Sequence, residues 1–203
     1  PARPIIALLP GSRRKEIVRI LPVLIGAAAL LYADDSRRQF VIPIAHERHL
    51  SDVNEIIYSA RDKSPPMPDT LKVVVDETYD ALNAADAAAV TSGTATLETG
   101  IIGTPMVIVY ATSGLNYVLL RPLISVEHYG LINLIAGKKV AKELIQRELS
   151  PQSVAAELSR LLDSEHNAAA RDELRAAAEK LGSGGASRRA AEAILKLIGP
   201  DGR

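Results

Sequence analysis

The stretch VTSGTATLE, residues 90–98, carries much of the information about the fold. It follows an apolar run, DAAAV, and leads into TGIIGTPMVIVY. The order is a strand, then a turn of small hydroxylated and glycine residues, then a helix that carries a single carboxylate, Glu98, about one turn in. Small residues let backbone N–H groups come close to a ligand, and a carboxylate beyond them can hold another part of it.

The same alternation of strands and helices runs through the first 110 residues. Apolar runs predict strands at residues 4–9, 39–45, 71–76, 86–92 and 105–110. These runs are continuous, which is typical of strands that are buried on both faces of a sheet. Apolar residues between 17 and 31 recur at helical spacing, and Pro22 among them predicts a kink or a restart. We therefore predict an α/β fold, a Rossmann-like doubly wound parallel sheet.

The chain turns helical after this sheet. Ser150 followed by Pro151 is typical of a helix start, and two further helical segments flank the sequence GSGG. We predict a domain at residues 1–150 and a helical extension at 151–203, which packs on that domain or on one that this chain lacks. Because the chain starts with Pro and enters a strand almost at once, we expect a fragment of a longer protein. An apolar stripe at residues 119–126 is predicted to belong to the core.

Composition excludes several classes of function. The 203 residues contain 24 Lys and Arg against 24 Asp and Glu, so no basic face for nucleic acid is expected. The absence of Cys excludes disulfides, thiolate zinc sites and thiol catalysis. No acidic cluster has a spacing suited to Mg²⁺, and no apolar run approaches the roughly 20 residues that span a bilayer. We predict neither a metal nor a cofactor.

Two loops fall at the carboxyl ends of predicted strands, where open α/β sheets bind their ligands. They are residues 10–13, PGSR, and residues 91–94, TSGT. Each precedes a helix, whose N-terminus attracts anions, so both resemble phosphate cradles, and Ser12 and Arg13 add a hydroxyl and a cation. Gly and Ser also serve as ordinary turn and capping residues, and neither loop matches a dinucleotide or P-loop motif. Glu98 is either a carboxylate stabilised by its helix or a ligand for vicinal hydroxyls such as those of a ribose.

Three motifs together resemble one family. ALLPGSRRKEI, AAVTSGTATLETGIIGTPMVIVY and GLINLIAGKKVAKELIQ are similar to the C-terminal half of lipid-A-disaccharide synthase, from about residue 4 to about residue 160. The resemblance implies one half of a two-domain GT-B glycosyltransferase. Such an enzyme moves diacylglucosamine from UDP-diacylglucosamine to 2,3-diacylglucosamine 1-phosphate, with inversion at the anomeric carbon.

The resemblance also implies what this chain lacks. The N-terminal half of the family carries the acceptor site, the membrane-facing surface and the catalytic base, so we assign no catalytic residue here and expect no activity from this half alone. The full-length protein is expected to be cytoplasmic, peripheral at the inner membrane, and a possible homodimer.

The family motifs assign eight residues to the UDP donor: Gly11, Ser12, Arg13, Ser92, Gly93, Thr94, Glu98 and Asn133. The first three are expected to face the diphosphate and the next three to line the nucleotide cleft. Glu98 is expected to bind the ribose hydroxyls, and Asn133 to lie near the donor sugar or its phosphate. The alternatives are a UDP-sugar-binding domain of another GT-B enzyme or of a UDP-GlcNAc epimerase, and a non-catalytic helical interaction module.

Overall fold

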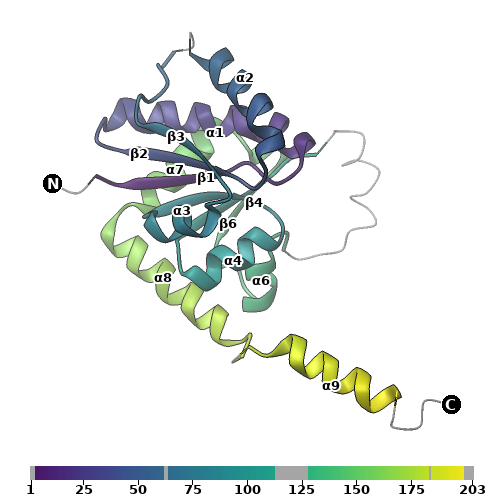
Figure 1. Cartoon of the computed structure of the whole chain (residues 1–203). Helices are drawn as coiled ribbons and strands as arrows, with labels where there is room; N and C mark the ends of the chain where they lie inside the picture. Colours follow the sequence, from purple (N-terminus) through teal and green to yellow (C-terminus); the bar gives the residue numbers. More distant parts are fainter. Residues whose placement is uncertain (1–2, 62–63, 113–127, 183, 199–203) are drawn as a thin grey trace.

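The computed structural model describes residues 3–61, 64–112, 128–182 and 184–198, and the predicted core stripe at 119–126 lies outside this part (Figure 1). The sheet has six strands in the order β3-β2-β1-β4-β5-β6, and every neighbouring pair is parallel. The strands are β1 (Ile5–Leu9), β2 (Gln39–Ile44), β3 (Leu71–Val75), β4 (Ala87–Thr91), β5 (Met106–Tyr110) and β6 (Lys142–Ile145). Sequence reasoning found the first five and missed β6, whose four residues include two charged side chains.

Helices cover both faces of the sheet, as predicted (Figure 1). The helices are α1 (Arg14–Asp34), α2 (Leu50–Ala60), α3 (Thr78–Ala84), α4 (Thr94–Ile102), α6 (Leu131–Ala136), α7 (Pro151–Leu161), α8 (Ser164–Glu179) and α9 (Ala186–Ile198), with short 3₁₀ helices η1 (Glu47–His49) and η3 (Gln146–Glu148). In β1, Ile6 and Leu8 pack in one apolar layer with α1, α2 and α7, whereas Ala7 and Leu9 pack in the other with α3, α4, α6 and α8. This alternation buries both faces of the central strand, which explains its continuous apolar sequence.

Helix α1 corrects two of the sequence-based expectations. It runs unbroken for 21 residues through Pro22, so the predicted restart was wrong. Pro22 lies on the exposed side of the helix, where water can satisfy the carbonyl that loses its N–H partner. By length and composition α1 is also apolar enough to cross a membrane, contrary to the expectation that no segment is, but half of that stretch is buried inside this domain.

The C-terminal helices differ in how they pack. The Ser150 hydroxyl caps α7 by accepting the N–H of Ser153 at 3.1 Å, and Pro151 is the first helical residue, as predicted. Helix α7 packs on α1, and α8 packs on α4 and α6. Helix α9 buries no side chain against the described residues and leads away from the sheet (Figure 1). Its large apolar side chains are therefore exposed: Ile194, Leu195, Leu197 and Ile198.

The contrast between the core and α9 generates a stability prediction. Leu24 in α1 is 0% exposed, and Leu197 in α9 is 88% exposed. We expect Leu24→Ala to lower the free energy of unfolding by about 2–5 kcal/mol, because it removes buried methyl groups and leaves a cavity. Leu197→Ala is the matched control and should stay within about 0.5 kcal/mol. Urea unfolding of both variants measures this, and equal losses would contradict the packing described here.

Candidate functional site

A cleft of about 650 Å³ opens beyond the carboxyl ends of β1 and β4. These strands are neighbours in the sheet, with Leu9 paired to Val90, so the loops that follow them lie side by side. A buried hydrogen bond ties the two strand ends together, since the hydroxyl of Thr91 donates to the carbonyl of Leu9 at 2.9 Å. The cleft is lined by seven of the eight predicted site residues: Gly11, Ser12, Arg13, Ser92, Gly93, Thr94 and Glu98.

The N-terminus of α4 is an open anion cradle on one side of this cleft. Gly93 is its N-cap and has a φ of +147°, a backbone conformation that residues with a side chain rarely adopt. No side chain of the described residues caps this helix, and no acidic residue occupies its first turn. Its first N–H groups and the positive end of its dipole therefore face the cleft, and no acidic side chain of its own first turn competes for them. This is the arrangement in which helices bind phosphate.

The N-terminus of α1 is different, because the protein fills it with its own carboxylate. Glu16 Oε2 accepts the backbone N–H groups of Ser12 at 3.1 Å and Arg13 at 3.3 Å. Glu16 Oε1 pairs with Arg13 Nη1 at 3.2 Å. Gly11, at φ +109°, is required for this closure, since a Cβ there would lie 2.5 Å from Glu16 Oε2. What this loop offers to a ligand is therefore the side chains of Ser12 and Arg13.

Sequence reasoning missed Glu16, which also lines the cleft. The only indication was a Glu at the third position of the helix after Arg13, the place of the acidic residue in a capping box. It also missed Asp76, Thr78 and Tyr79, which follow β3 and also line the cleft. The signal for them was topological, because the carboxyl ends of parallel strands meet at one edge of the sheet.

Residues 129–131 form the wall of the cleft next to α4. The hydroxyl of Ser92 donates to the carbonyl of Tyr129 at 2.7 Å, and the N–H of Leu131 donates to the hydroxyl of Thr96 at 3.1 Å. The ring of Tyr129 stacks on that of Tyr110, with 6.5 Å between the centroids. Ser92 thus holds this segment in place as well as lining the cleft.

Asn133 is the predicted site residue that the structure keeps out of the cleft. Its side chain is fully buried, and its Nδ2 donates to the carbonyl of Ala141 at 2.8 Å and to Glu143 Oε1 at 2.9 Å. Its Oδ1 accepts the N–H groups of Val140 and Ala141, both at 2.9 Å. All of its hydrogen-bonding capacity is used inside the protein. The prediction that it lies at the donor sugar or its phosphate is thus not supported by its placement.

The role that Asn133 does have is to orient Glu143. The carboxylate of Glu143 also accepts the N–H of Tyr129, at 3.0 and 3.1 Å, and that of Gly130 at 2.9 Å. Glu143 is only 7% exposed, so these donors replace the hydrogen bonds with water that its carboxylate loses on burial. Asn133 is therefore a scaffold residue that holds the cleft wall through one buried carboxylate.

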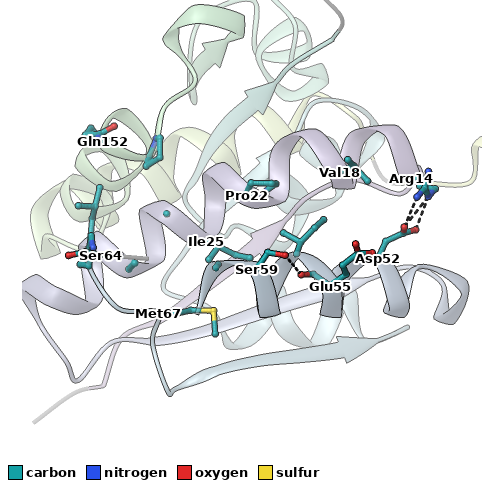
Figure 2. A pocket seen from close by; sticks show the side chains of 17 residues that line it. Arg14, Val18, Pro22, Ile25, Asp52, Glu55, Ser59, Ser64, Met67 and Gln152 are labelled. Atoms are coloured by element: carbon teal, nitrogen blue, oxygen red, sulfur yellow. Dashed lines mark hydrogen bonds and ion pairs between the residues drawn. The ribbon is translucent and has the colours of Figure 1, made fainter. Parts of the chain in front are cut away.

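A second hollow, of about 420 Å³, lies between α1 and α2 and contains none of the eight predicted residues (Figure 2). Its lining is mostly apolar and includes Val18, Pro22, Ile25 and Met67. At one end the Arg14 side chain pairs with Asp52, with 2.9 Å between Nη2 and Oδ1. None of the eight predicted site residues lines this hollow, so the residues that the sequence assigned to a ligand gather at the cleft beyond β1 and β4.

The buried network around Asn133 generates a second prediction. We expect Asn133→Ala to lower the free energy of unfolding by about 1–3 kcal/mol, because Glu143 and two backbone N–H groups lose a partner out of reach of water. Asn54→Ala, at an exposed position of α2, is the control and should change stability by less than about 0.5 kcal/mol. Thermal unfolding compares the two. A neutral effect of Asn133→Ala would show that the network is not closed as described.

Comparison with known proteins adds independent information. The model of the lipid-A-disaccharide synthetase family matches residues 1–197. Lipid-A-disaccharide synthase of Syntrophus aciditrophicus is 44% identical to this chain, and the match covers 95% of this chain and 49% of the relative. The enzyme of Trichlorobacter lovleyi is 43% identical, and the match covers 97% of this chain and 50% of the relative. The chain therefore spans about half the length of these curated relatives.

Solved structures with lower identity support the fold. S. aureus MnaA, solved with UDP, has a TM-score of 0.64 at 16% identity, and the match covers 97% of this chain and 46% of MnaA. The calicheamicin glycosyltransferase CalG4 has a TM-score of 0.61 at 19% identity, and the match covers 100% of this chain and 44% of CalG4. The C-terminal CMP-Kdo binding domain of WaaA from Acinetobacter baumannii has a TM-score of 0.57 at 12% identity, and the match covers 89% of this chain and 90% of that domain. The fold is thus a Rossmann-like half of a GT-B fold, and by its family match this chain belongs to the lipid-A-disaccharide synthase family.

Proposed function

We propose that this chain is the donor-binding half of a lipid-A-disaccharide synthase and that its cleft holds UDP-diacylglucosamine. The observation that carries the proposal is the lining of one cleft by Arg13, the open N-terminus of α4 and Glu98. The first two offer positive potential for a diphosphate, and the carboxylate offers two acceptors for the hydroxyls of a ribose. A nucleoside diphosphate has both groups on one small molecule.

The proposed reaction explains why the cleft is built this way. The 6-hydroxyl of 2,3-diacylglucosamine 1-phosphate attacks the anomeric carbon of the donor from the face opposite to the diphosphate. The bond from that carbon to the diphosphate oxygen breaks, the configuration inverts, and the attacking hydroxyl loses its proton to a base. UDP leaves with its bonding electron pair. N–H groups and cations fixed near the diphosphate lower the energy of this step because negative charge grows there as the bond breaks.

The base and the lipid acceptor belong, in this proposal, to the half of the protein that this chain does not include. We place the contact with the inner membrane and the cytoplasmic location in the full-length protein as well. Exposed apolar residues of α9, including Leu197 and Ile198, are proposed to pack on that other half or on a second copy of the chain.

A UDP-GlcNAc epimerase or another GT-B transferase remains the second candidate on fold alone. Both would use the same cleft for a UDP-sugar, and the solved structures similar to this chain are too distant in sequence to separate them. The family match over residues 1–197 favours the synthase.

The direct test of the cleft is titration of the chain with UDP, UMP and uridine by calorimetry. We expect Glu98→Ala to weaken all three ligands by about 10- to 100-fold, because each ligand carries the ribose diol. Arg13→Ala should weaken UDP by about tenfold and leave uridine unchanged, because its partner is a phosphate. These two patterns separate the ribose contact from the phosphate contact.

The control for this titration is Glu55→Ala. Glu55 lines the apolar hollow between α1 and α2 and is not part of the cleft lining. Affinity for UDP should change less than about twofold in this variant. UDP binding that is indifferent to both Glu98→Ala and Arg13→Ala would remove the donor-site assignment.

Activity is predicted to need both halves of the enzyme. We expect the chain alone to form no disaccharide from the lipid donor and acceptor, because a bound donor has no acceptor hydroxyl or base beside it. Adding the separately made N-terminal half of a relative tests this by product formation. Disaccharide formed by the isolated chain would show that the base lies in this half.

A further inference from the structure

The cleft beyond β1 and β4 contains a carboxylate, Glu16, that lies beside Arg13 and that the proposed function does not use. The Glu16 side chain is 19% exposed, and that of Arg13, its ion-pair partner, is 82% exposed. We propose that Glu16 is a positioning residue that holds Arg13 in the empty cleft and makes UDP bind less tightly relative to the UDP-sugar donor. This inference rests on the proposed function, since it concerns the same cleft and the same ligand.

The two oxygens of Glu16 have separate partners. Oε2 is fixed by the backbone N–H groups of Ser12 and Arg13, which hold it against the loop at Gly11. Among the described residues, Oε1 is held only by the guanidinium of Arg13, at 3.2 Å. When Arg13 turns to a diphosphate, Oε2 keeps its backbone partners and Oε1 loses its cation. The carboxylate therefore stays in the cleft as a negative charge that no longer has a cation as its partner.

This remaining charge distinguishes product from donor. The terminal phosphate of UDP has a second ionisation near pH 6, as other phosphate monoesters do, so at pH 7.5 it carries an extra negative charge. In a UDP-sugar the same phosphate is esterified and cannot ionise a second time. A fixed carboxylate beside the diphosphate repels UDP more than the UDP-sugar. Glu16 thus helps the product to leave and gives Arg13 a partner once it has left.

The competing explanation is that Glu16 only caps α1. A carboxylate at this position stabilises a helix through the hydrogen bond that it accepts from the N-cap backbone. Glutamine is also found at this position of capping boxes, because its amide oxygen accepts the same bond. Glu16→Gln therefore removes the charge and keeps the cap, which separates the two explanations.

The experiment is calorimetric titration of the wild-type chain and Glu16→Gln with UDP and with UDP-N-acetylglucosamine at pH 7.5. We expect the variant to bind UDP about three- to fivefold more tightly, and UDP-N-acetylglucosamine less than about twofold more tightly. Glu16→Ala, which is neutral but lacks the cap, should show the same selective gain at a lower melting temperature. Thermal unfolding of each variant checks that it is folded.

Asp52→Asn is the matched control. Asp52 forms an ion pair with Arg14, the residue next to Arg13, but it lines the apolar hollow and not the cleft (Figure 2). Asp52→Asn also removes one negative charge, but from the first turn of α2, outside the cleft lining. The ratio of its affinities for UDP and UDP-N-acetylglucosamine should therefore equal that of the wild type. The same gain in Asp52→Asn would show a general charge effect and overturn the role of Glu16.

The remaining outcomes separate this inference from the function on which it rests. The donor site stands if the wild type binds UDP and Glu98→Ala does not. If Glu16→Gln then binds UDP no better than the wild type, only the role of Glu16 is refuted. A gain in Glu16→Gln that is equal for both ligands also refutes it. A wild-type chain that binds neither ligand defeats the donor site and the role of Glu16 together.

Discussion

The parallel pairing of β1 with β4 is the constraint on which the cleft depends. It places Leu9 opposite Val90, and the buried hydrogen bond from Thr91 to Leu9 fixes the two strand ends at the edge of the sheet. Two loops about 80 residues apart in sequence thereby lie beside one another, and the helices that follow both begin there. A one-residue slip in this pairing would turn alternate side chains to the opposite face and misalign the loops.

The two helix N-termini at this edge contribute different chemistry. At α4 the backbone is open, because a glycine N-cap brings no side chain that could occupy it. At α1 the backbone is occupied by Glu16, and the side chain of Arg13 is what remains for a ligand. One helix therefore offers backbone N–H groups at fixed positions, and the other offers a cation on an exposed side chain.

A family motif can be important without touching a ligand. Asn133 belongs to the motif GLINLIAGKKVAKELIQ, yet its side chain is buried with Glu143 beneath the cleft wall. Glu143 comes from β6 and accepts the N–H groups of residues 129 and 130. The motif thus builds a buried polar network in which each group needs the others, because an unpaired carboxylate inside a protein is costly.

The sequence by itself determined the fold class, five of the six strands and seven of the residues that line the cleft. Each of these follows from local patterns: continuous apolar runs, glycine turns and helix caps. The tertiary structure alone decided that Glu16 closes one cradle, that Asn133 is buried, that β6 extends the sheet and that residues after β3 complete the cleft. These depend on which side chains meet across the fold, and a local pattern carries no information about a partner that is distant in sequence.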